Sequence, residues 1–398
     1  MSAGAASSAA GRLAYTQSAT EQIYVGEPAE VAIVRELERT AARRAFIVAS
    51  GTLARTTDAI ERIRVALGPS YAGMFAEVPA HGTRAAALAA AAAARAAAAD
   101  TLIAIGGGSV IDTTKVVSIC LQHGLTQHDD LEPYRIGMDA AGRGLRPVFE
   151  GPSVRIIAVP TTLSGAEFYE AGGVTDERVK RKQGYAHRLL APRAIVLDPQ
   201  ITRHTPAGLW VSTGVRAIDH AVETLGSLQS NAFCDDLADS ALRALAAALP
   251  RSAAAPDDLD ERLKCMIGVW QSMLPLAGGV PMGISHATGH ALGGTFGVPH
   301  GHTSCVTAPA ALAFNQPVNA HRQLRISAAL GDAGAPAGRL LDALIRRLGM
   351  PRSLTDIGLA RADLPRLADA VMHDRWTRTN PRRLERVEQV GEFLETLF

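Results

Sequence analysis

The first half of the chain alternates short apolar runs with stretches of helical spacing. Apolar runs without polar alternation that end at turn residues predict buried strands, and they fall at 44–50, 101–105, 155–159 and 194–197. Between them, the alanine-rich segment 84–100 predicts a helix, because alanine has the highest helix propensity. Buried strands that alternate with helices favour an α/β fold with a parallel sheet covered on both faces.

The second half loses the strand pattern after about Pro206. Helical spacing continues through 211–228, 231–248, 259–276 and 286–295 and on to residue 398. We therefore predict an α/β domain over 1–205, followed by an all-helical domain over 206–398. The cleft between two such domains is the expected place for a ligand.

Two segments fall outside this pattern. Residues 122–153 are polar and rich in glycine and proline, which predicts an excursion over the surface that is in part ordered. The arginine-rich stretch 375–386 predicts a solvated face with no function.

Composition excludes several classes of protein. Forty basic residues balance 39 acidic ones, so the net charge of +1 predicts no binding of nucleic acid or of an anionic membrane. Four cysteines without a CxxC pair do not form a disulfide framework. No apolar run reaches about 18 residues, and the first twelve residues do not resemble an export signal. We expect a cytoplasmic enzyme with a small-molecule substrate.

A glycine loop follows the predicted strand 101–105 and opens a helix. Gly106, Gly107 and Gly108 allow a ligand to approach the backbone closely, and Ser109 follows them. The unpaired N–H groups at a helix start suit a pyrophosphate. An ordinary tight turn explains the loop equally well, since the third glycine of a GxGxxG fingerprint is missing.

Hydroxyl residues follow the next predicted strand. Thr161 and Thr162 follow residues 155–159 after a single proline, Pro160. Their hydroxyl and N–H groups suit a nucleotide, while capping of the following helix is the simpler alternative.

Histidines gather in the helical half. His286 and His290 are four residues apart and share one helix face. His300 and His302 follow a glycine-rich turn, and His220 lies upstream. Imidazoles suit zinc or iron, and a histidine without a metal can act as an acid or base. A single histidine on a helix is more often merely hydrogen-bonded or solvated.

Taken together, these motifs resemble the iron-containing (group III) alcohol dehydrogenase family, which includes the maleylacetate reductases. The resemblance covers about residues 20–320 and rests on four matches in chain order. They are the GGGS loop with Asp112 and Lys115, Pro160-Thr161-Thr162 with Gly165 and Glu167, Asp198-Pro199, and the HxxxH and PHG motifs at 286–290 and 299–301. It implies an N-terminal dinucleotide-binding domain and a C-terminal helical domain, as the hydrophobic pattern also predicts.

The resemblance implies a nicotinamide dinucleotide bound by the loop 106–109, Asp112, Thr161, Thr162 and Lys182. Ser50 ends the strand where NAD-preferring relatives often have Asp. Its hydroxyl neither binds the ribose strongly nor repels a 2′-phosphate. We therefore predict use of both NADH and NADPH, with a preference below roughly 100-fold, or about 2.7 kcal/mol.

The metal site of the family is altered. Metal-dependent members hold the ion through positions that correspond to Arg216, His220, His286 and His300. A divalent ion about 4 Å from the Arg216 guanidinium would be repelled by roughly 8 kcal/mol. Three neutral histidines can still hold a metal, whereas Asp219 is a poor substitute ligand, because adjacent helix positions diverge by about 100°. We predict that the protein works without a metal, with His290 as the candidate proton relay.

Maleylacetate reductases also lack the ligating Asp, and segments 75–81 and 292–300 are similar to theirs. Arg216 suits a substrate carboxylate, although pairing with Asp219 or Glu223 is the structural alternative. The predicted function is NAD(P)H-dependent reduction of maleylacetate, or a similar unsaturated oxo-diacid, to 3-oxoadipate. A metal-dependent (Fe/Zn) alcohol or aldehyde dehydrogenase and a non-catalytic nucleotide-binding protein are the alternatives. The resemblance also implies a homodimer.

Overall fold

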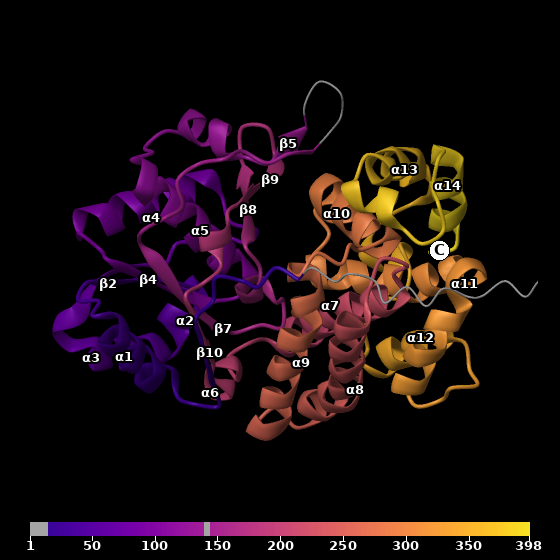
Figure 1. Ribbon diagram of the computed structural model, residues 1–398, viewed down its shortest axis with the longest axis horizontal. Coiled ribbons are helices and arrows are strands. Elements are labelled where there is room, and N and C mark those ends of the chain that lie inside the picture. Colours follow the sequence, from indigo (N-terminus) through magenta and orange to yellow (C-terminus); the bar gives the residue numbers. More distant parts are fainter. Residues whose placement is uncertain (1–14, 139–143) are drawn as a thin grey trace, which may run out of the picture.

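The computed structural model describes residues 15–138 and 144–398. Its N-terminal half is built on a six-stranded sheet in which every neighbouring pair is parallel, and Figure 1 shows it in indigo to magenta. In spatial order the strands are β1 (Gln22–Val25), β10 (Ala194–Leu197), β7 (Arg155–Pro160), β4 (Thr101–Gly106), β2 (Ala45–Ala49) and β3 (Tyr71–Phe75). The four predicted strands are confirmed. The twelve residues without an export-signal pattern lie outside the described residues.

Helices cover both faces of this sheet, as the unalternating apolar strands predict. Every residue of β2, β4 and β7 is buried. On one face Ile33 and Ile63 pack against the sheet, and on the other Ala90 and Val116 do so. The covering helices are α1 (Ala29–Thr40), α2 (Gly51–Thr56), α3 (Ala59–Leu67), α4 (Arg84–Ala96) and α5 (Gly108–His123). The alanine-rich segment is thus helix α4, and its small side chains allow close packing.

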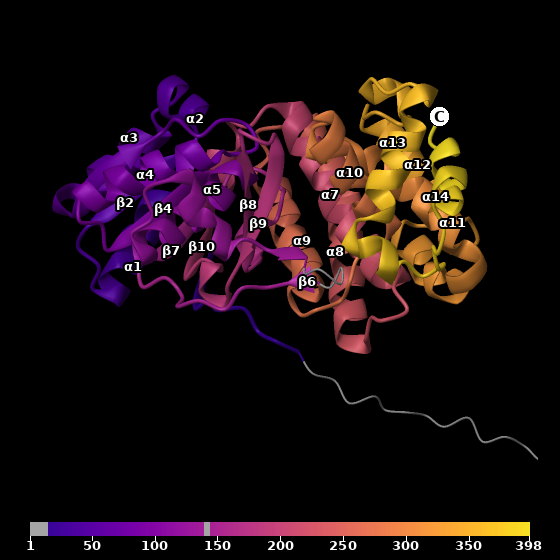
Figure 2. The same ribbon diagram turned by 90° about the horizontal axis from the view of Figure 1, so that it is seen from above.

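The C-terminal half is helical, and it lies beside the sheet in orange and yellow (Figure 2). Its helices are α6 (Pro199–Thr202), α7 (Ala207–Gly226), α8 (Ala232–Ala254), α9 (Leu259–Ala277), α10 (Ile284–Phe296), α11 (His300–Ala329), α12 (Ala337–Arg347), α13 (Leu364–Met372) and α14 (Val387–Glu395). One apolar core joins α7, α8, α9 and α11, and a second joins α10 to α13 and α14. The domain boundary at 205/206 stays a prediction.

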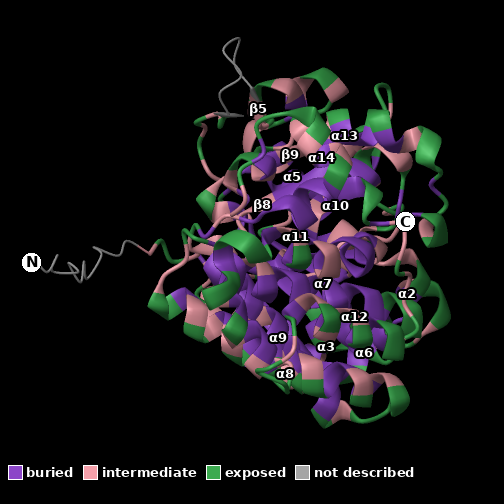
Figure 3. Ribbon diagram, turned by 90° about the vertical axis from the view of Figure 1, so that its right-hand side faces the viewer, coloured by how far each residue is buried: buried purple, intermediate pink, exposed green. Residues whose placement is uncertain are grey.

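Helix α7 runs through the middle of the helical half. Nearly all its residues from Trp210 to Gly226 are buried, and it packs against α8, α9 and α11. Figure 3 shows the buried colour concentrated on the inner helices, whereas α8 and α12 have exposed outer faces. Polar side chains on such a helix are costly unless they find partners, so those of α7 are informative about function.

The strand pattern missed an antiparallel hairpin formed by β8 (Ala171–Asp176) and β9 (Arg181–Ala186). Strand β9 reads RKQGYA and is exposed over its first half, so it lacks the apolar run of a buried strand. The hairpin packs on α5, and Thr175 pairs with Lys182. It therefore places Lys182 beside the start of α5.

One loop prediction agrees with the structure and one needs correction. Segment 122–153 lies largely at the surface and is in part ordered: where it is described, it contains the 3-10 helix η2 (His128–Tyr134), buries Leu131 and pairs β5 (Gly137–Met138) with β6 (Gly144–Leu145). Its residues 139–143 lie outside the described part of the chain. The arginine-rich stretch is not merely a solvated face, because it forms the 3-10 helix η7 (Arg375–Thr379) against α10 and buries Asn380.

Candidate active site

The two predicted nucleotide segments meet at the carboxyl ends of neighbouring strands. Strands β4 and β7 pair in register up to Gly106 and Pro160. A Cβ built on Gly107 would lie 3.0 Å from Cγ2 of Thr162, so the glycine loop touches the threonine segment. Ligands of α/β sheets bind outside the carboxyl ends of the strands. The predicted loop and threonines therefore form one edge.

The remaining predicted cofactor residues surround this edge. The Thr161 N–H donates to the Gly106 carbonyl at 3.0 Å, and Ser50 lies against Gly106 and caps α2. The Ser109 hydroxyl accepts from the His81 N–H at 3.0 Å. Gly106 has a φ of 157°, which favours glycine there.

Lys182 links the hairpin to the loop. Its Nζ donates to Oδ2 of Asp112 at 3.3 Å, from β9 to the second turn of α5. The Lys182 charge also contributes to lowering the pKa of His300, although burial is the larger cause. Strand β9, which carries Lys182, also packs against the histidine-bearing helix α10.

The four histidines come together from three helices. The rings of His220 and His286 have centroids 4.7 Å apart, and those of His290 and His300 stack in parallel at 5.9 Å. Burial lowers the pKa of His286 to about 3 and holds those of His220 and His300 well below their usual range. These three rings are therefore neutral at pH 7. The side chain of His290 differs, because it is 37% exposed.

Arg216 lies buried among these rings. A Cβ built on Gly289 would stand 4.0 Å from its Nη1, so the guanidinium lies against α10. The Nη1 atom has no hydrogen-bond partner among the described residues. Burial lowers the pKa of Arg216 to about 10, which still leaves it charged at pH 7. Of the described residues, Asp219 and Glu223 act on it through space, and neither forms the ion pair that was the structural alternative.

Glu223 fixes the start of α10. Its Oε2 accepts from the Gly283 N–H at 2.9 Å and lies 2.7 Å from Nδ1 of His286, while Oε1 accepts from the Ser285 N–H at 3.0 Å. These bonds satisfy N–H groups that a helix start leaves open. Burial raises the pKa of Glu223 to about 7.

Asp219 also reaches α10, which corrects the sequence argument about it. Its Oδ2 accepts from the hydroxyls of Ser285 and Ser304 at 2.8 and 2.7 Å and lies 3.4 Å from Nδ1 of His286. Burial raises the pKa of Asp219 to about 6. Asp219 does diverge from His220 around α7, but it faces the histidine of a neighbouring helix instead.

The described part of the chain contains two groups of three side chains that could bind a metal ion. Within each group, the possible ligand atoms lie within 4.8 Å of one another. One is Asp219, Glu223 and His286, and neither includes His220 or His300. The ligand positions of the resemblance thus hold a buried guanidinium and three imidazoles, which are not gathered as a triad.

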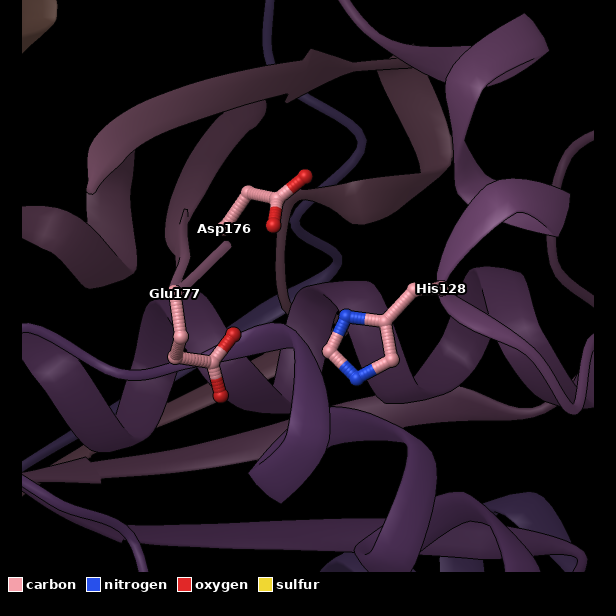
Figure 4. Close-up of side chains that lie close together, drawn as sticks. All are labelled: His128, Asp176 and Glu177. Atoms are coloured by element: carbon pink, nitrogen blue, oxygen red, sulfur yellow. The ribbon is translucent and has the colours of Figure 1, made fainter. Parts of the chain in front are cut away.

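The second group is His128, Asp176 and Glu177, where the start of η2 meets the tip of the hairpin (Figure 4). Asp176 is already paired with Arg84 at 3.2 Å and Arg178 at 3.0 Å, and Arg84 is fully buried. Two guanidinium groups this close oppose a divalent cation. The group is therefore explained by ion pairs that hold the hairpin.

Sequence reasoning missed one contact of His290. Its Nδ1 lies 2.9 Å from Oδ2 of Asp374, which directly precedes η7. Asp374 is 84 residues downstream of His290, and no spacing rule connects them. Glu223 was considered only as a partner of Arg216, although its i, i+3 spacing from His220 could have placed it on the site.

The sequence profile described as "Iron-containing alcohol dehydrogenase" matches residues 20–199, and the one described as "Fe-containing alcohol dehydrogenase family, C-terminal" matches residues 210–398. The chain belongs to the iron-containing alcohol dehydrogenase family. It is thus an oxidoreductase of an NAD(P)-dependent family with small-molecule substrates.

Several relatives carry the name maleylacetate reductase. The protein of Burkholderia cepacia is 33% identical over 354 residues, 89% of each chain. Maleylacetate reductase 1 of Cupriavidus pinatubonensis is 30% identical over 94% of this chain and 93% of its own. The crystal structure of maleylacetate reductase from Agrobacterium tumefaciens superposes with a TM-score of 0.81, at 25% identity and 98% coverage of both chains.

Among the helices of the described residues, none combines the length and the apolar character that a membrane span requires.

Proposed function

We propose that the protein is an NAD(P)H-dependent reductase of maleylacetate, or a closely related unsaturated oxo-diacid, and that it works without a metal. The observation that carries the proposal is the buried guanidinium of Arg216, whose Nη1 lacks a partner among the described residues. The relatives named maleylacetate reductase support the choice of substrate.

Arg216 needs an anion that the described residues do not place against it. A buried charge is costly unless it is paired and hydrogen-bonded. A guanidinium binds a carboxylate through two parallel hydrogen bonds. One carboxylate of a diacid would complete this site, whereas a neutral aldehyde would leave the charge unpaired.

The residues at the family's metal positions do not fit a divalent ion. Arg216 puts a positive charge where metal-dependent members have an Asp, and the three imidazoles are neutral, so they do not offset it. Asp219 and Glu223 already accept hydrogen bonds from Ser285, Ser304 and the start of α10. Arg216 would take over the electrostatic role that a metal has in other members of the family.

The proposed chemistry divides between two side chains. When bound, the reduced nicotinamide supplies the hydride, which adds to one carbon of the substrate's C=C bond. The electron pair of that bond moves toward the ketone oxygen as an enolate, and Arg216 binds the substrate and stabilises the added negative charge. His290 then delivers a proton to the neighbouring carbon, which restores the ketone and gives the saturated oxo-diacid.

For the coenzyme, we propose the edge formed by residues 106–109, Thr161 and Thr162, with Asp112 and Lys182 at its side. Ser50 accepts a hydrogen bond from the Leu53 N–H as the cap of α2. It brings no negative charge that would repel a 2′-phosphate, which supports use of both NADH and NADPH. We also propose a homodimer, on the resemblance to the family.

One observation favours a second candidate, a metal-dependent alcohol or aldehyde dehydrogenase. Nδ1 of His220 and Nε2 of His286 are buried without a partner among the described residues, as ligand atoms awaiting an ion would be. The deciding assay offers NADH and NADPH with maleylacetate and with neutral aldehydes, before and after chelation. Chelator-resistant turnover of the diacid supports the proposal. Turnover of aldehydes alone that is lost with the metal would replace it by the second candidate.

A further inference from the structure

We infer that Asp374 is a positioning residue that sets the orientation and tautomer of His290 for proton delivery. The inference rests on the proposed function, in which His290 is the proton donor. It starts from the 2.9 Å contact between Nδ1 of His290 and Oδ2 of Asp374.

His290 is the ring best placed to reach a substrate. Its side chain is 37% exposed, while His220 and His286 are buried. One face of the ring stacks in parallel on His300, and the Nδ1 edge is taken by Asp374. The ring therefore has its Nε2 edge left for a reacting group or solvent.

The Asp374 carboxylate is itself fixed by the backbone of η7. Its Oδ1 accepts from the Trp376 N–H at 2.8 Å as the cap of η7. The segment that follows is tied to the start of α10, because the Thr379 hydroxyl donates to the Met282 carbonyl at 2.7 Å and the Ile284 N–H donates to Oδ1 of Asn380 at 3.1 Å. The same segment thus anchors α10 and supplies the carboxylate that meets His290 further along this helix.

The contact dictates where the hydrogens are. An ionised carboxylate can only accept, so Nδ1 of His290 carries a hydrogen. In the charged ring Nε2 also carries one and can give it to the substrate carbon. The neutral ring that remains keeps Nδ1–H and has a bare Nε2, which takes up a proton from solvent at its exposed edge. Without Asp374 the ring is free to rotate and to adopt the other tautomer.

The most informative variant is Asp374→Asn. Its amide oxygen can still accept from Trp376, so the turn is kept, but its NH₂ group faces Nδ1 and favours the opposite tautomer. We expect kcat with maleylacetate and NADH to fall by about 10- to 100-fold, with KM and coenzyme affinity nearly unchanged. Arg378→Ala, an exposed change in the same 3-10 helix, should leave kcat as it is.

A double-mutant cycle separates positioning from a structural role. If Asp374 acts through His290, Asp374→Ala lowers kcat in the wild type but has no further effect in His290→Ala. Equal losses in both backgrounds, or no loss in either, would overturn the inference. If the wild type does not turn over maleylacetate at all, it is the proposed function that fails.

A second measurement does not depend on turnover. Long-range ¹H–¹⁵N spectra of histidine-labelled protein report the tautomer of each ring, and His290→Ala assigns the signal. We expect the neutral His290 ring to carry its hydrogen on Nδ1 in the wild type and to shift toward the Nε2–H form in Asp374→Asn. The same tautomer in both proteins would contradict the inference whatever the substrate is.

Discussion

Arg216 of α7 lies against Gly289 of α10. A side-chain carbon at position 289 would stand 4.0 Å from Nη1 of Arg216 and 2.9 Å from Oγ1 of Thr303. The missing side chain of Gly289 therefore makes room for Thr303, and it leaves the guanidinium at van der Waals distance from α10.

Gly289→Ala tests whether this room is needed. Glycine inside a helix is normally less favourable than alanine by about 1 kcal/mol, but the 2.9 Å contact with Thr303 opposes that gain. We expect no rise in Tm and a several-fold higher KM for the diacid. Gly294→Ala is the matched control, since no atom of the described residues lies within 4 Å of a Cβ there, and it should raise Tm with KM unchanged. Equal gains in Tm for both variants would show that position 289 is not restricted.

Replacement of Arg216 should affect substrate binding selectively. Hydrogen bonds to a charged group contribute about 1.5–3 kcal/mol, so Arg216→Ala should raise KM for maleylacetate by roughly 10- to 100-fold. Arg216→Lys should recover only part of this, because an ammonium cannot bind a carboxylate through the planar fork. Coenzyme affinity, measured by quenching of protein fluorescence, should stay near the wild-type value. Unchanged KM in both variants would remove the carboxylate from the account.

Lys182→Ala should weaken coenzyme binding. Lys182 projects from β9 beside the glycine loop and contacts Asp112 at 3.3 Å, so its loss should raise the Kd for NADH and NADPH about tenfold each. Lys180→Ala, in the turn of the same hairpin, serves as the control for general effects on the hairpin. If both variants bind the coenzyme equally well, Lys182 has no role at the nucleotide edge.

Glu223 should make stability depend on pH in a stated direction. Its pKa is raised to about 7 by burial, against about 4.3 in an unfolded chain. Between these values the folded state binds more protons, so this group's contribution to the free energy of unfolding falls as pH rises from about 4.3 to 7. Relative to Glu223→Gln, the wild type should lose at least about 1 kcal/mol over this window in urea unfolding. A stability difference that is flat with pH would contradict a buried, neutral-leaning Glu223.

Which features could be predicted from the sequence depends on whether they arise from local patterns or from contacts between distant segments. Four buried strands and helix α4 could be predicted, because burial on both faces and helix propensity leave local patterns. The β8–β9 hairpin could not, because β9 is polar and its pairing partner gives it order. Motif spacing could bring residues 106–109 and Thr162 to one edge, since parallel strands end together.

The side chains that contact the histidines could not be predicted from local sequence patterns. Asp219 reaches His286 across a helix–helix contact, so divergence around its own helix was the wrong criterion. Asp374 meets His290 only because η7 folds back onto α10. The lack of a partner for Arg216 Nη1 among the described residues likewise depends on distances between helices that no spacing along the chain specifies.

In the proposed mechanism, the fixed guanidinium of Arg216 takes the electrostatic role that a metal has in other members of the family. This can be tested by measuring turnover of maleylacetate by protein stripped with a chelator and shown by elemental analysis to hold no stoichiometric iron or zinc. We expect kcat and KM equal to those of the untreated protein and no gain on adding either metal. Loss of turnover on stripping, restored by one equivalent of iron or zinc, would contradict it.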